Sequence, residues 1–186
     1  MSFLQQLKDR LFPAPDTTHA VPVYTEAHQI KREFVTFNNA YRIGLLGFYN
    51  GPDDQEAIDN YKKKLEQLGY ECEVLLFFDK KERDSQLYLP HFDTTALNKK
   101  TGLPESPKTD LFQVKKFDLL INLFHEPIPA LLHIAHHSQA RCRVAPHLPH
   151  VEDISDLMVP VQATDTLPQI IEKINSTLEL KPYVRQ

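Results

Sequence analysis

The chain has 186 residues, of which 41% are hydrophobic and 25% are charged, as expected for a globular protein that can bury a core of its own. Its formal net charge of −4 argues against general binding to nucleic acid or to anionic membranes. No apolar run approaches the length of a membrane span, and the acid-containing N-terminus does not resemble a secretory signal. We therefore expect a cytoplasmic protein with neither of these partners.

Residues 1–29 are predicted to form an arm that precedes the folded domain. Ser2 and Gln5 have the spacing of a capping box, and Pro13 would end the helix that they open. A polar, proline-containing stretch follows. The amphipathic helix could pack on its own domain, or it could bind a protein partner or a membrane surface. The partner-binding candidates are its apolar residues Phe3, Leu4, Leu7 and Leu11.

A strand, a helix and a second strand follow the arm. An apolar strand is predicted over 41–49, and Asp53 and Asp54 then open a helix with charges that suit its macrodipole. Gly69 is a natural stop for this helix, and the second strand covers 71–78. Because the connections are short, we expect the two strands to be parallel neighbours joined by a right-handed crossover.

The pattern is less regular on either side of this unit. Residues 30–37 could form an additional edge strand. Residues 79–110 show no hydrophobic periodicity and are predicted to be a long irregular connection. A connection of that length in a compact domain is either a functional lid or an insertion with structure of its own, and the sequence does not decide between them.

Residues 117–124 form an apolar run with almost no alternation, which is typical of a strand covered on both faces in a parallel sheet. We predict that this strand lies in the middle of the sheet. Thr166 and Gln169 have capping-box spacing at the start of the last helix. Between the central strand and this last helix, the predicted elements are a helix over 129–138 and strands over 141–144 and 156–161.

Alternating strands and helices predict an α/β fold for residues 30–182, with a single open, mostly parallel sheet and helices on both faces. We expect a flavodoxin-like or Rossmann-like order, in which the second strand lies outside the first and the central strand lies on its other side. Cys72 and Cys142 fall in predicted strands, which indicates two buried thiols in a reducing compartment; a disulfide between them is the alternative.

Ligands of open parallel sheets bind at the carboxyl ends of the strands, near the point where the strand order reverses. The residues that follow the predicted strands are therefore the candidates for a site at this carboxyl rim. They are Tyr49, Asn50, Asp79, His125, Glu126, His147 and His150.

The same rim does not fit a nucleotide cofactor. The turn after the first strand has one glycine, Gly51, where a dinucleotide fingerprint needs three, and Asp53 and Asp54 occupy the helix start where a phosphate would sit. The sequence also lacks a Walker A loop and a G-x-S-x-G nucleophile motif. We therefore expect no cofactor and assign no catalytic residue.

Three histidines of the helix over 129–138 have i, i+3 and i+4 spacing, which makes them weak candidates for metal binding. No glutamate joins them in an H-E-x-x-H motif. The alternative is that the apolar residues of this helix face the sheet while the histidines cover its outer surface. The three are His133, His136 and His137.

Five segments carry a pattern that extends beyond these local features: 98–104, 116–123, 129–135, 138–146 and 156–159. Together they resemble a bacterial family of short proteins known only as a domain of unknown function, and the resemblance covers about residues 40–180. It implies a Rossmann-like α/β fold and no activity. The family pattern has a glycine where this chain has Ala145.

Two functions from different classes follow. The first is a non-catalytic α/β module that acts through protein–protein interaction and uses the N-terminal arm or the long connection. The second is a protein or enzyme that binds a small phosphorylated or sugar-like ligand at the histidine-rich rim. The missing catalytic motifs favour the first, with a protein partner and an oligomeric state that the sequence does not define.

Overall fold

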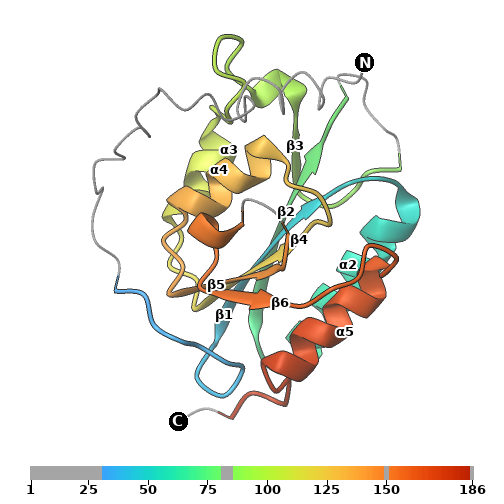
Figure 1. The fold of residues 1–186 in the computed structure, drawn as a ribbon, viewed down its shortest axis with the longest axis vertical. Helices are drawn as coiled ribbons and strands as arrows, with labels where there is room; N and C mark the ends of the chain where they lie inside the picture. The colour runs from blue at the N-terminus through green and yellow to red at the C-terminus, as the bar shows by residue number, and fades with distance from the viewer. Residues whose placement is uncertain (1–30, 81–85, 149–150, 185–186) are drawn as a thin grey trace.

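A six-stranded sheet runs through the computed structural model, which describes residues 31–80, 86–148 and 151–184 (Figure 1). The strand order is β3-β2-β1-β4-β5-β6, and every neighbouring pair is parallel. The second strand lies outside the first, and β4 lies on the other side of β1, as predicted. The strands are β1 (Arg42–Phe48), β2 (Glu71–Phe78), β3 (His91–Asp93), β4 (Leu119–Leu123), β5 (Cys142–Pro146) and β6 (Leu157–Val159).

Helices cover both faces of the sheet, which confirms the predicted α/β class (Figure 1). One core lies between the sheet and the pair α2–α5, and a second lies between the sheet and the pair α3–α4. The helices are α2 (Pro52–Gln67), α3 (Pro107–Val114), α4 (Pro129–His137) and α5 (Leu167–Thr177), with short 3₁₀ turns η1 (Thr94–Ala96) and η2 (Glu152–Ile154).

Strand β4 occupies the middle of the sheet, between β1 and β5. Leu120 and Ile121 are 0% exposed and Leu123 is 1% exposed, because helices pack against both faces of this strand. The unbroken apolar run therefore predicted both the position and the burial of β4. The capping box of Thr166 and Gln169 at the start of α5 is also confirmed.

The connection over 79–110 contains more structure than its sequence pattern predicts. Strand β3 adds a sixth strand beside β2, η1 follows it directly, and α3 begins at Pro107. The described part of this connection is thus a structured insertion. Helix α3 was missed because its capping box pairs Ser106 with Thr109, rather than with the glutamate or glutamine that identifies such a box in a sequence.

Residues 31–37 do not form the additional edge strand suggested by their sequence. Val35 and Phe37 are buried, but their segment is irregular and packs on elements distant in the chain. Phe37 N–H donates to the Leu178 carbonyl over 3.2 Å, and Glu33 N–H donates to the Arg141 carbonyl over the same distance. The apolar residues here fill the core without joining the sheet.

Cys72 and Cys142 are free, buried thiols, as the sequence indicates. Burial raises the pKa of the Cys72 thiol to about 12 and also raises that of Cys142. Among the described residues, no helix is long and apolar enough to cross a membrane.

Candidate functional site: the carboxyl rim

The strand order reverses between β1 and β4. The chain leaves β1 through α2 on one face of the sheet and leaves β4 through α4 on the other face. The two connections diverge, so a crevice opens above the carboxyl ends of these central strands, as in other doubly wound sheets. This is the place that the sequence predicts for a site.

A pocket of about 300 Å³ lies at this crevice. It gathers side chains from the ends of three strands, because the ends of parallel strands lie at one edge of the sheet. Four of the seven rim residues predicted from sequence line it, namely Tyr49, Asn50, Asp79 and Glu126. Its other lining residues are Phe48, Gly51, Phe78 and Lys80.

Asp79 is the most distinctive group in this rim pocket. It is the first residue after β2 and is partly buried, and its Oδ1 atom is buried without a hydrogen-bond partner among the described residues. Burial raises the pKa of the carboxyl to about 6, and the neighbouring positive charge of Lys80 only partly opposes this shift. A carboxylate oxygen held in this way can accept a hydrogen bond that the protein itself does not supply.

Aromatic side chains form a wall of the pocket beside this carboxyl. Tyr49 is 4% exposed, and its ring meets Phe78 edge-to-face with the centroids 5.4 Å apart. The N–H of Tyr49 donates to the Phe77 carbonyl over 2.9 Å, which extends the β1–β2 pairing to the rim. This pairing and burial fix the Tyr49 side chain in place.

The start of α2 borders the pocket at Gly51. Gly51 caps the helix without a side-chain hydrogen bond, and a Cβ at this position would meet no atom within 4 Å. Acidic residues Asp53 and Asp54 follow in the first turn. Burial raises the pKa of Asp54, while the nearby His125 acts to lower it. This concentration of acids works against the binding of a phosphate at the helix start.

The rim histidines do not converge on the pocket. His125 is exposed and influences Asp54, but it does not line the pocket. His147 is exposed at the end of β5, where its N–H donates to the Val159 carbonyl over 2.9 Å. His150 lies outside the described residues. A histidine-centred site is therefore not assembled from the two rim histidines that the structure describes.

The three α4 histidines pack on one another. The rings of His133 and His137 lie 4.1 Å apart between centroids, and His137 Nδ1 lies 2.9 Å from the His133 carbonyl oxygen. Burial, followed by the charges of His137 and His136, lowers the pKa of His133 to about 4. The apolar residues of this helix face the sheet. In the described part of the chain, no group of three or more histidine, cysteine or acidic side chains is placed to hold a metal ion.

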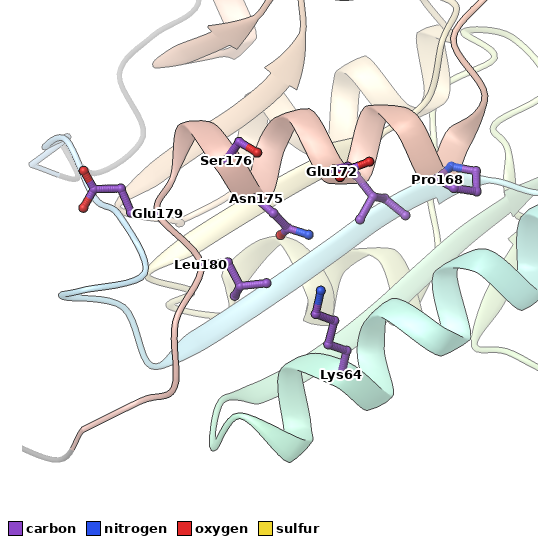
Figure 2. A pocket seen from close by; sticks show the side chains of 8 residues that line it. Lys64, Pro168, Glu172, Asn175, Ser176, Glu179 and Leu180 are labelled. Atoms are coloured by element: carbon purple, nitrogen blue, oxygen red, sulfur yellow. The ribbon is translucent and has the colours of Figure 1, made fainter.

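A hollow of about 460 Å³ lies between α2 and α5, away from the carboxyl rim (Figure 2). Lys64 points from α2 toward Glu172 and Asn175 of α5. Asn175 already accepts a hydrogen bond from the Tyr61 hydroxyl over 2.6 Å. The hollow contains none of the buried, unpartnered polar atoms found among the described residues, so we place the candidate site at the smaller rim pocket.

Sequence reasoning missed one charged residue of the rim pocket, Lys80. The signal was available, because Lys80 follows Asp79 directly at the end of a predicted strand. The partner-binding candidates of the N-terminal arm, Phe3, Leu4, Leu7 and Leu11, lie outside the described residues.

Comparison with known proteins identifies the family but no activity. Residues 24–179 match the model of a family of unknown function, DUF6913, which confirms the resemblance seen in the sequence. No curated protein matches the chain. Among solved structures, a family 9 glycosyl transferase from Veillonella parvula is similar, with a TM-score of 0.49 and 11% identity. The alignment covers 77% of this chain but only 42% of that protein. The chain belongs to the DUF6913 family of unknown function.

Proposed function

We propose that the rim pocket binds a small, uncharged molecule rich in hydroxyl groups, such as a sugar-like compound. The observation that carries this proposal is that Asp79 lines the pocket while its buried Oδ1 atom has no hydrogen-bond partner among the described residues. A ligand hydroxyl can donate to the Asp79 carboxylate, and such charge-assisted hydrogen bonds are stronger than neutral ones.

The other lining residues suit the same class of ligand. Asn50 can both donate and accept hydrogen bonds, and the partly buried Phe48 supplies aromatic surface for the apolar face of a sugar ring, with Tyr49 and Phe78 packed behind it. Pockets for small molecules commonly combine an apolar wall with a few polar groups that fix orientation. The volume of about 300 Å³ lies at the small end of such sites and fits a single ring better than a dinucleotide.

Charge favours the uncharged member of the two ligand classes predicted from sequence. Asp79 and Glu126 line the pocket, Asp53 and Asp54 lie at its border, and Lys80 is the cation among the lining residues that the structure describes. A phosphorylated ligand would meet more negative than positive charge here. We propose binding alone at this pocket, without a catalytic step.

The test begins with the full-length protein and whatever small molecule it retains through purification, identified by mass spectrometry after denaturation. A panel of uncharged sugars and the matching sugar phosphates is then titrated, with the backbone amide signals of Asn50 and Asp79 as the NMR readout. We expect the uncharged sugars to shift these signals and the phosphates to bind more weakly.

Asp79→Ala should weaken binding at least about tenfold, since a hydrogen bond to a charged group contributes about 1.5–3 kcal/mol. The matched control is Asp110→Asn on α3, which removes an exposed carboxylate outside the pocket and should leave affinity unchanged. The proposal fails if the wild type retains no compound and no member of the panel shifts the rim signals, or if Asp79→Ala binds as well as the wild type.

A further inference from the structure

The outer edge of β2 is only partly covered. β3 has three residues and pairs with Leu76–Phe78 alone. Within the described chain, no strand lies beside residues 72–75 on that side of β2. Half of an eight-residue strand is therefore left as an open sheet edge.

The backbone of this open edge is oriented outward at two residues. Leu76 N–H donates to the Pro90 carbonyl on the outer side over 2.9 Å, whereas the Phe77 carbonyl accepts from Tyr49 beside β1. In a parallel strand the N–H and C=O of alternate residues point to the same side. Cys72 and Val74 therefore direct their backbone groups outward, where no described residue pairs with them.

A buried glutamine explains why β3 does not extend further along β2. Gln55 of α2 is 2% exposed; its Nε2 donates to the Gln86 carbonyl over 2.8 Å, and its Oε1 accepts from Tyr88 N–H and Leu89 N–H. These hydrogen bonds hold the segment before β3 against α2. The chain consequently reaches the sheet only at Pro90, and the edge before Leu76 stays open.

A groove of about 310 Å³ follows the open edge and is flanked by a helix from each face of the sheet. Lys62 of α2 lies on one side, and Lys108, Leu111 and Lys115 lie on the side of α3, Lys115 just beyond its end. Leu111 is 62% exposed and adds an apolar side chain to this wall of the groove.

The groove carries more positive than negative charge. Lys62 pairs with Glu66, and Lys115 pairs with Glu73, the acidic residue on the groove wall. Lys108 donates a hydrogen bond to the His91 carbonyl over 2.6 Å. It forms no ion pair with a carboxylate among the described residues. A partner with acidic side chains would complement this surface.

We propose that this edge groove binds an extended segment of a partner protein, in which apolar residues alternate with acidic ones. The segment would add a strand beside residues 72–75, its backbone pairing with Cys72 and Val74. Successive side chains of a strand point to opposite faces, so apolar residues would contact Leu111 on the α3 side while acidic residues approach Lys62 on the α2 side. Lysines alone could protect an edge from pairing, but the exposed Leu111 adds nothing to such protection.

The probe is a phage-displayed library of random decapeptides, selected on the full-length protein. We expect enriched peptides to contain a stretch of about five residues, free of proline, that alternates apolar and acidic side chains. A synthetic peptide of the enriched sequence should slow hydrogen exchange at the Val74 amide. Both Leu111→Asp and Lys62→Glu should weaken its affinity at least tenfold.

Matched controls separate these effects from general damage. Val184→Asp places the same charge on a residue that is 75% exposed elsewhere, and Lys64→Glu reverses a charge on the far side of α2; both should bind the peptide like the wild type. Thermal unfolding of each variant confirms that it is folded.

Four results would overturn the proposal. One is the absence of any enriched peptide, and another is a selected peptide that binds Leu111→Asp as tightly as the wild type. The third is a wild-type dimer that Leu111→Asp converts to a monomer, which would identify a second copy as the occupant. The last is faster exchange at Val74 in free protein after deletion of residues 1–30, which would identify the chain's own segment. None of them bears on ligand binding at the rim pocket.

Discussion

Two aspartates at opposite ends of the sheet have opposite environments. Asp118, just before β4, accepts hydrogen bonds from Tyr41 N–H over 2.8 Å, from Arg42 N–H over 2.9 Å and from Arg141 over 2.6 Å. Burial opposes ionisation of Asp118, but the hydrogen bonds from Arg42 and Arg141 together hold its pKa below the ordinary value. Asp79, just after β2, has a buried unpartnered oxygen and a pKa raised to about 6.

The difference shows which end of the sheet serves stability. At the amino end, a carboxylate joins two strand ends and an arginine, and its bonding capacity is used within the protein. At the carboxyl end, a carboxylate keeps an unused acceptor that destabilises its ionised form. A protein can tolerate such a group where a ligand completes its hydrogen bonds, because sites of function commonly hold perturbed carboxyls.

The largest effect on stability should come from a substitution in β4, the central strand that runs between the two ends of the sheet. Leu120→Ala in β4 removes a side chain that is 0% exposed and leaves a cavity between the sheet and α4. We expect a loss of about 2–5 kcal/mol in the free energy of unfolding, measured with urea. A loss below about 1 kcal/mol would contradict the central position of β4, since exposed sites tolerate such changes.

The next effect concerns the amino end. Asp118→Asn should lower the free energy of unfolding by about 2–3 kcal/mol at pH 7, because the hydrogen bonds from Arg141 and two backbone N–H groups lose a charged acceptor. The folded pKa of Asp118 lies below the unfolded one, so its stabilisation is present above the unfolded pKa and disappears as the pH falls through the folded pKa. The difference in the free energy of unfolding between variant and wild type should therefore shrink as the pH falls below about 4.

The same substitution at the carboxyl end should act in the opposite direction. Asp79→Asn removes a charge that the folded state disfavours, so the variant should be more stable than the wild type by about 1–2 kcal/mol above pH 6. The folded pKa lies above the unfolded one, so the gain should shrink as the pH falls from about 6 and vanish below about pH 4. Asp110→Asn is the control, with no expected change. A destabilised Asp79→Asn would mean that the carboxylate already has a partner.

The smallest effects should appear at the two ends of β1. Arg42 and Glu71 form an ion pair of 3.4 Å with side chains that are 58% and 49% exposed, so Arg42→Ala should change stability by at most about 1 kcal/mol.

Asn50 is exposed in the rim pocket, and Asn50→Ala should change stability by less than about 0.5 kcal/mol. Only Asn50→Ala should weaken the binding of an uncharged sugar, which titration of both variants would show.

The fold could be predicted wherever an element was long or buried on both sides. The apolar run of 117–124 identified β4, and the alternation of strands and helices identified the sheet order around it. β3 could not be recognised, because three residues are too few to show a period of two. Its existence depends on pairing with Leu76–Phe78, which is a tertiary contact rather than a local preference.

The predicted topology gave the location of the rim pocket, but it did not determine which rim residues line it. Parallel strands place Asp79 and His125 at one edge of the sheet, yet Asp79 lines the pocket and His125 does not. Which side chain enters the crevice depends on the conformation of each loop after the strand. The Oδ1 atom of Asp79 is buried without a partner because of how distant parts of the chain pack around it, and the sequence near Asp79 does not predict this packing.

The position of β4 between β1 and β5 also constrains the order in which the chain can fold. β1 and β2 lie close in sequence, but the other side of β1 pairs with residues 119–123, far along the chain. Long-range parallel pairing of this kind slows folding, and a growing chain must hold β1 with one edge of unpaired backbone N–H and C=O groups until β4 has been synthesised. We expect fragments ending before residue 119 to aggregate, while those that include β5 and α5 stay soluble. The soluble fraction of each truncated chain after centrifugation would measure how far solubility depends on the presence of β4.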